Sequence, residues 1–385
     1  MRGPQLVDPP TARHFPPART GRLIHGGVQP CLAPLSRPSR VPVVSLRFQG
    51  SILGCVRPGD HGQTLRWRPT WTERPLPLPE VLGPLVRGRR DPAFRWSGDG
   101  SAWLAMRTPP GPATLHVVAF PDGAVEFCGH GSGAAWAVAA GPALLGSRDD
   151  IGGFVPHHRL VAQTWRRFAG HRIPRTGRVW EALLGAVLEQ RVTGKESRAA
   201  WRGLLVRHGE PAPGPPPSGS TRSQSVLSGS VPCGPPPGMY LPPGPQQVRR
   251  IADWEWHRLG VDGNRRRTVR AVAAVGDSLE RLGAEVPAAD LDRALRSVPG
   301  VGPWTVAETL QRAVGHPDAV SVGDYHLAAF VGRALTGRPV DDEQMLELLE
   351  PYGGQRYRAV RMLEISGFTA PRFGPRMTVQ DMRAL

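Results

Sequence analysis

Apolar residues recur with the spacing of amphipathic helices through the second half of the chain. The clearest run, at i, i+3, i+4, i+7 and i+8, consists of Trp180, Leu183, Leu184, Val187 and Leu188. This spacing predicts one apolar helix face. Thr193-x-x-Glu196 has the capping-box pattern, which predicts a second helix running to about His208. Further helices are predicted over 248–258, 265–282, 290–298, 303–314, 326–335, 341–349 and 355–365.

A different pattern precedes these helices. Ala102–Met106 and Thr114–Phe120 are short apolar runs, and the second is followed by the turn sequence Pro121-Asp122-Gly123 and by Val125–Phe127. This order predicts a β-hairpin. Ala134–Leu145 is rich in alanine and is predicted to be helical. The predicted fold is therefore mainly α with a small N-terminal α/β domain, and α+β overall.

Domain boundaries follow from composition, because 47 Gly and 43 Pro residues require long stretches without regular structure. We predict a disordered basic arm at 1–60, a small α/β domain at 75–155 and an all-α domain at 156–370. A flexible insertion rich in Pro, Gly and Ser is predicted at 211–245, and a tail at 371–385.

The arm at 1–60 has two further interpretations. It is either untranslated, with the true start near Val41 or later, or an organelle transit peptide, since it is rich in Arg and poor in acidic residues. Its prolines argue against the amphipathic helix that such peptides form.

Charge and cysteine content narrow the function classes. The chain carries 48 basic and 32 acidic residues, a net charge of +16, and Lys195 is its single lysine. No run approaches the roughly 18 apolar residues of a membrane span, so no membrane partner is predicted. The four cysteines are Cys31, Cys55, Cys128 and Cys233. Their wide spacing predicts no metal site and a reduced, cytoplasmic protein.

Residues 289–325 contain the motif that decides the functional prediction. Asp290 is predicted to cap a helix, Pro299-Gly300-Val301-Gly302 turns the chain, and Pro303 suits the first position of the next helix. Helix, hairpin, helix is a phosphate-binding arrangement, because N–H groups and the helix dipole at the second helix point outward. We assign DNA contact to the hairpin and to Thr305. The alternative is an ordinary tight turn between helices.

Three further segments carry a resemblance. Asp324 follows Gly302 by 22 residues within Val322-Gly323-Asp324-Tyr325-His326, and the sequence resembles the HhH-GPD DNA glycosylase superfamily. Leu188–Gly194 resembles the helix-end segment that this family places beside the lesion, and Tyr352–Ala359 resembles its late helix. The similarity is greatest to the bacterial 3-methyladenine glycosylase II (AlkA) type and covers about 80–370.

The resemblance implies a role for each matching residue. Asp324 would be the catalytic carboxylate, which stabilises an oxocarbenium ion. Trp304, Glu308 and Tyr325 would form the base pocket. Gln190 and Arg191 would fill the gap left by a flipped nucleotide. Other interpretations are an N-cap role for Asp324, core packing for Trp304, and a solvated helix-end position for Arg191.

Three comparisons with branches of the family refine this prediction. Trp304 stands where strand-cleaving members carry a lysine, which implies a monofunctional enzyme without lyase activity. No cysteine follows Cys233, so no iron–sulfur cluster and no other cofactor is predicted. Glu308 replaces the second pocket aromatic of the AlkA type, which leaves the preferred base open.

The predicted function is hydrolysis of the N-glycosidic bond of alkylated bases in base excision repair, by a monomer acting on damaged double-stranded DNA. The alternatives are a non-catalytic, structure-specific DNA-binding protein and a glycosylase for deaminated or mispaired bases. A cluster of arginines is either a phosphate-binding face or a solvated charge run. It consists of Arg159, Arg166, Arg167, Arg172, Arg175 and Arg178.

Overall fold

The computed structural model describes residues 50–52, 63–214 and 234–369. All of them belong to one compact unit, Arg47–Leu385. The predicted tail at 371–385 and most of the predicted arm lie outside the described residues. Residues 215–233 of the predicted insertion lie outside them as well.

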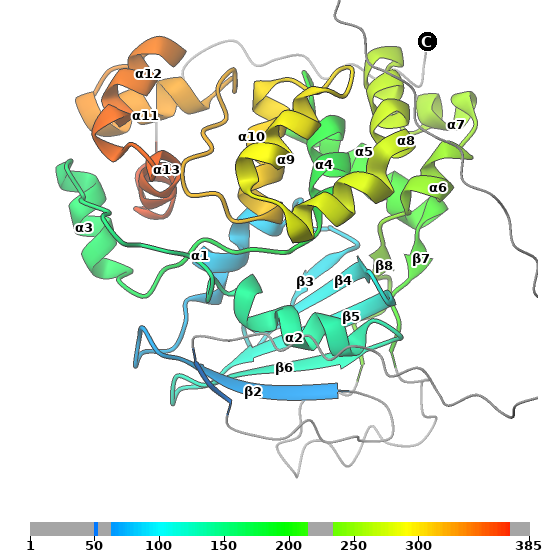
Figure 1. The fold of residues 1–385 in the computed structure, drawn as a ribbon, viewed down its shortest axis with the longest axis horizontal. Helices are drawn as coiled ribbons and strands as arrows, with labels where there is room; N and C mark the ends of the chain where they lie inside the picture. The colour runs from blue at the N-terminus through cyan, green and yellow to red at the C-terminus, as the bar shows by residue number, and fades with distance from the viewer. Residues whose placement is uncertain (1–49, 53–62, 215–233, 370–385) are drawn as a thin grey trace, which may run out of the picture. The chain divides into compact units, whose positions relative to one another are not determined.

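The N-terminal part of the described chain is an antiparallel sheet of six strands in the order β1-β2-β6-β5-β4-β3 (Figure 1). Its strands are β1 (Gly50–Ile52), β2 (Gln63–Pro69), β3 (Phe94–Trp96), β4 (Ala102–Thr108), β5 (Gly111–Ala119) and β6 (Val125–His130). The predicted hairpin is confirmed, since β5 and β6 pair from Thr114 opposite His130 to Ala119 opposite Val125. Alternating burial along β2 is typical of a strand with one covered face.

Helices make up the rest of the described chain. Two short ones precede β3: α1 (Leu78–Leu82) and η1 (Gly83–Leu85). After the sheet come α2 (Ala134–Leu144), α3 (Arg159–Arg167), α4 (Val179–Glu189), α5 (Gly194–His208), α6 (Pro245–Arg249), α7 (Asp253–Arg258), α8 (Gly263–Glu285), α9 (Ala288–Arg296), α10 (Pro303–Ala313), α11 (Leu327–Thr336), α12 (Asp342–Leu349), η2 (Glu350–Tyr352) and α13 (Arg356–Ile365). The predicted α+β class is confirmed.

Helix α4 is the centre of the helical part. Nine of its eleven residues are buried, and it packs against α5, α8 and α10. Helix α5 begins as predicted, because Thr193 accepts a hydrogen bond from the Glu196 N–H while the Glu196 carboxylate accepts one from the Thr193 N–H. These two helices fix the turn at Gln190–Val192 between them.

Several predicted boundaries need correction. The sheet begins at β1 and β2, upstream of the predicted domain start at 75. The strand pattern was missed in the sequence because these short runs lie among Pro and Arg residues. The insertion predicted at 211–245 is structured at both ends: β7 (Glu210–Pro211) pairs with β8 (Tyr240–Leu241), and Leu241 is fully buried. The helix predicted over 248–258 is two helices, α6 and α7.

Asp290 is not the cap of its helix. Helix α9 begins at Ala288 with Pro287 as its N-cap, so Asp290 lies in the first turn, where it pairs with Arg293. The helix therefore starts three residues earlier than a cap at Asp290 would place it, and Pro287 has the extended backbone of an N-cap residue. None of the helices in the described ranges is both long and apolar enough to span a lipid bilayer.

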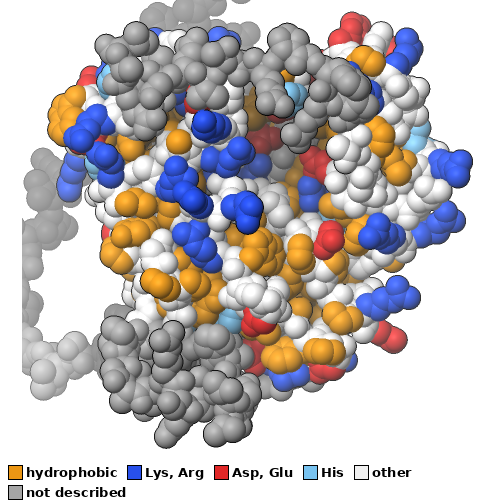
Figure 2. All heavy atoms as spheres, turned by 180° about the vertical axis from the view of Figure 1, so that it is seen from behind, with side chains coloured by type: hydrophobic (Ala, Val, Ile, Leu, Met, Phe, Trp, Pro, Cys, Tyr) orange, Lys and Arg blue, Asp and Glu red, His pale blue; other side chains and the backbone are white. Residues whose placement is uncertain are grey.

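The arginine cluster at 159–178 is not one solvated face. Arg172 and Arg178 are buried, Arg172 lies over the ring of Trp71, and Arg178 pairs with Glu280. Only the α3 arginines are exposed. Positive charge nevertheless gathers on the face opposite to that of Figure 1, where Lys and Arg side chains lie across the middle of the surface (Figure 2).

Candidate active site

The hairpin between α9 and α10 is held from inside and open on its outer side. Val298 and Val301 are buried and anchor the turn. Gly300 has a φ of +86°, and a Cβ there would lie 2.2 Å from the Thr268 Oγ1. A Cβ on Gly302 would meet no atom within 4 Å. The backbone at Gly302 and at the start of α10 therefore remains open to an approaching phosphate.

Gln190 and Thr305 brace this hairpin. The Gln190 side-chain amide donates to the Gly300 carbonyl (3.0 Å) and to the Thr305 hydroxyl (2.8 Å). Thr305 is buried, so its hydroxyl faces inward and not toward the outer surface. The predicted gap-filling residue Gln190 and the predicted DNA-contacting residue Thr305 thus tie the end of α4 to the hairpin.

Arg191 has a left-handed backbone conformation. Its φ of +53° is the sole positive value at a non-glycine residue in the ranges that the structure describes, and the residue is exposed. A left-handed conformation at such a residue is strained and is found preferentially at functional sites. The turn at the end of α4 therefore presents Arg191 outward beside the braced hairpin.

The Asp324 carboxylate is fixed by three hydrogen bonds. One oxygen accepts from the backbone N–H groups of His326 (2.8 Å) and Leu327 (3.0 Å) at the start of α11. The other accepts from the Trp304 indole N–H (3.1 Å). Asp324 therefore satisfies N–H groups at the start of the helix and contacts the predicted pocket tryptophan at the same time. The predicted spacing between hairpin and carboxylate brings the two together in space.

Asp318, the acidic residue nearest to Asp324 in sequence, does not lie against Trp304. Its carboxylate accepts from the Arg356 backbone N–H and pairs with the Arg356 guanidinium (2.7 Å). Tyr325 is 74% exposed, and its ring packs edge-on against His326. Of the predicted pocket residues, Trp304 thus contacts Asp324 directly, whereas Tyr325 points to solvent.

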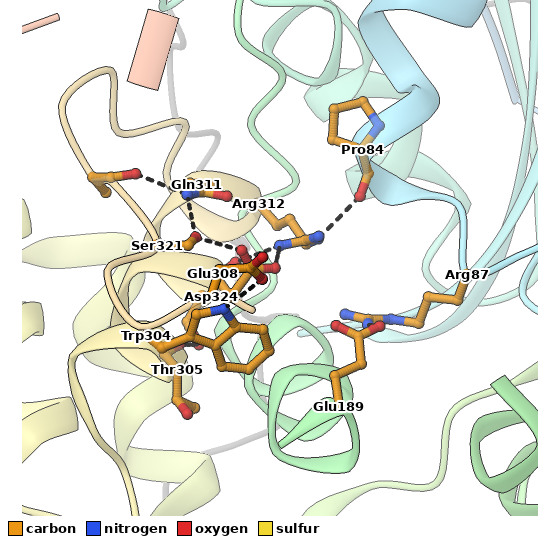
Figure 3. A network of polar contacts seen from close by, with 12 residues as sticks. Pro84, Arg87, Glu189, Trp304, Thr305, Glu308, Gln311, Arg312, Ser321 and Asp324 are labelled. Atoms are coloured by element: carbon orange, nitrogen blue, oxygen red, sulfur yellow. Dashed lines mark hydrogen bonds and ion pairs between the residues drawn. The ribbon is translucent and has the colours of Figure 1, made fainter. Parts of the chain in front are cut away.

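Trp304, Glu308 and Arg312 lie along one face of α10, spaced four residues apart (Figure 3). The Glu308 carboxylate pairs with Arg312 (2.6 Å) and accepts from the Ser321 hydroxyl. Arg312 also donates to the Pro84 carbonyl (3.0 Å). Burial would lower the pKa of Arg312, but the charges of Glu308 and Glu189 outweigh it and raise the pKa. Glu308 is therefore engaged by Arg312 and Ser321.

An ion pair that the sequence analysis did not identify lies opposite this face. Arg87 binds Glu189, the last residue of α4, at 2.5 Å. Burial would raise the pKa of Glu189, but the charges of Arg87 and Arg312 lower it overall. A carboxylate at the C-terminus of a helix opposes the helix dipole. An acidic residue at the predicted end of this helix was therefore the one sequence feature that could have indicated a basic partner for Glu189.

Comparisons with known proteins can be set beside this geometry. No family model matches the chain. It is 30% identical over 162 residues to a "Probable bifunctional transcriptional activator/DNA repair enzyme AlkA" from two strains of Mycobacterium tuberculosis. The match covers 41% of this chain and 28% of the relative, so the chain spans little more than a quarter of that protein.

Solved structures extend the similarity. A 3-methyladenine DNA glycosylase from Archaeoglobus fulgidus aligns with a TM-score of 0.58 at 14% identity, over 79% of this chain and 98% of that one. An 8-oxoguanine glycosylase/lyase from Clostridium acetobutylicum aligns with a TM-score of 0.55 at 12% identity, over 78% and 95%. The chain therefore has the fold of the HhH-GPD DNA glycosylases and resembles the AlkA type in part of its sequence.

Proposed function

We propose that the protein is a monofunctional DNA glycosylase that hydrolyses the N-glycosidic bond of alkylated bases in duplex DNA. The observation that carries the proposal is the hydrogen bond from Trp304 to Asp324, beside a hairpin whose outer backbone is open. An aromatic base-binding surface, a fixed carboxylate and a phosphate-binding turn are the groups that this reaction requires.

Asp324 acts on the sugar. As the bond to the base breaks, positive charge develops at C1′, and a fixed carboxylate stabilises that charge and orients the attacking water. Its hydrogen bonds to Trp304, His326 and Leu327 hold it in place before substrate binds. The carboxylate therefore needs little reorganisation in the transition state.

The surface around Asp324 holds the DNA. N–H groups at the hairpin bind the phosphate backbone without reading bases, and the net charge of +16 supplies long-range attraction to DNA. Arg191 occupies the space left by the flipped nucleotide, and its strained turn keeps it projecting. The Trp304 indole attracts a cationic alkylated purine through its electron-rich face.

The absence of lyase chemistry is part of the proposal. A lyase needs an amine that attacks C1′, and the position that carries it in strand-cleaving relatives is Trp304 here. Lys195, the single lysine of the chain, lies exposed on α5. The product expected is therefore an intact strand with an abasic site.

The test is base release from methylated duplex DNA by the wild-type protein and two variants. Asp324→Asn should lose release by at least about 100-fold, the effect of removing a group that stabilises transition-state charge. The control, Asp318→Asn, changes the neighbouring acid that Arg356 holds and should retain release. Strand breaks should form only after alkali.

Each other outcome identifies an alternative. Strand breaks without alkali would assign lyase activity and point to Lys195. Unimpaired release by Asp324→Asn would exclude that carboxylate from catalysis. No release with DNA binding intact would favour the non-catalytic DNA-binding protein, unless duplexes with hypoxanthine, 8-oxoguanine or mispaired bases are cleaved instead.

A further inference from the structure

We propose that Arg87 and Glu189 read the Watson–Crick edge of the flipped base and give preference to bases that keep the edge of guanine. The inference rests on the proposed function and specifies the substrate class of the same site. It concerns an ion pair between the loop that follows η1 and the end of α4, 102 residues apart in sequence.

The pair lies beside the proposed base pocket. Glu189 directly precedes Gln190, whose amide bonds Thr305, the neighbour of Trp304. Arg312, on the same face of α10 as Trp304, is near enough for its charge to lower the pKa of the Glu189 carboxyl. In the view of Figure 3, the Trp304 indole lies between Asp324 and the Arg87–Glu189 pair. A base that stacks on Trp304 would point its far edge toward the pair.

The chain is shaped to hold the Arg87 guanidinium. The guanidinium lies over the Trp201 ring at 5.0 Å. The backbone N–H of Arg87 donates to the Asp91 carboxylate. On the other side is Gly185, in the middle of α4, where a Cβ would lie 2.0 Å from the Arg87 Cζ. A glycine inside a helix costs roughly 1 kcal/mol relative to alanine. That residue leaves room for the guanidinium.

Glu189 keeps an open acceptor. One carboxylate oxygen binds Arg87, and no hydrogen bond from any described residue reaches the other. The Glu189 side chain is 26% exposed, whereas that of Arg87 is 9% exposed. The positive charges of Arg87 and Arg312 keep the carboxylate ionised at neutral pH. The pair thus offers a base the N–H donors of Arg87 next to the Glu189 carboxylate, which can only accept hydrogen bonds.

This donor and acceptor order matches guanine. Guanine presents the O6 acceptor next to the N1–H and N2–H donors, so the guanidinium can bind O6 while the carboxylate binds N1–H and N2–H. 3-Methyladenine has neither an O6 acceptor nor a 2-amino group. A base alkylated at N7 of guanine keeps the whole edge and carries the positive charge that the Trp304 ring attracts.

The experiment measures binding of duplexes that resist hydrolysis. One contains 2′-fluorinated 7-methylguanosine, a second contains 3-deaza-3-methyladenosine, and a third is undamaged. Wild-type protein should bind the first most tightly. Glu189→Gln should weaken that binding about tenfold, as expected for one lost bidentate base contact, and change binding of the second by less than roughly twofold. Arg87→Lys, which keeps the charge but loses the planar fork, should lose the same preference.

The matched control is Glu210→Gln. Glu210 on β7 pairs with Arg107 on β4 in an ion pair that includes no residue of the proposed base pocket, so its loss should change neither affinity. Equal weakening of both lesion duplexes by Glu189→Gln, or no weakening, would overturn the inference. Failure of the proposed function is a separate result: no base would be released from methylated DNA, while the binding preference would remain.

Discussion

At the scale of single residues, the two hairpin glycines have different reasons to be glycine. Gly300→Ala should destabilise the protein by about 1–3 kcal/mol, because its φ of +86° and the nearby Thr268 hydroxyl both reject a Cβ. Gly302→Ala should fold with wild-type stability but weaken DNA binding, because its Cβ would occupy the space of the phosphate. Urea unfolding and duplex binding separate the two effects. Equal stability losses would contradict this division.

The sequence contains local spacing but not contacts between distant residues. The positions of Trp304 and Asp324 could be predicted, because the hairpin and the carboxylate lie in one short segment. The Arg87–Glu189 pair could not, because its partners come from separate regions of the chain. The inward direction of the Gln190 and Thr305 side chains also depends on packing between α4 and the hairpin.

At the scale of elements, the sheet contains a buried histidine that makes stability depend on pH. His116 on β5 stacks on Trp103 at 4.0 Å and hydrogen-bonds Ser101. Burial lowers the pKa of His116 from 6.5 to about 4. The neutral form is therefore favoured in the folded protein, and its stability contribution is complete above pH 6.5. It is lost as the pH falls toward 4, by up to about 1.4 kcal/mol per pH unit.

The expected result is a steeper loss of stability for wild type than for His116→Gln between pH 7 and pH 5. Free energies of unfolding from urea titrations at several pH values measure this difference. Because carboxylates titrate in both proteins, the difference between the two curves isolates His116. Parallel curves would exclude His116 as the titrating group.

Elements with a strong local signal were predictable. The capping box at Thr193 fixes the start of α5, and the turn at 121–123 fixes the β5–β6 hairpin. Strand β8 was not predictable, because two residues in a Pro-rich stretch carry no period. Its burial comes from packing against β4 and from pairing with β7.

At the scale of the whole described unit, a buried ion pair joins α13 to the chain after α2. Arg358 and Asp149 are 0% and 2% exposed and form two hydrogen bonds, of 2.7 and 2.6 Å. Arg358→Met should destabilise the protein by about 3–5 kcal/mol, because it leaves a buried carboxylate unpaired. The double variant with Asp149→Leu should recover part of that loss. Chemical denaturation of the single and double variants provides the measurement, and additive losses would contradict the pairing.

The strands β7 and β8 have a consequence for engineering. Glu210 lies opposite Leu241 and Pro211 lies opposite Tyr240. The Ala212 N–H donates to the Met239 carbonyl, so residues 212 and 239 are held next to each other. The entropy of closing a loop grows only with the logarithm of its length, by roughly 0.6 kcal/mol for each doubling. The stretch between β7 and β8 is therefore a permissive insertion point, where a reporter domain with adjacent termini should be accepted with little loss of stability.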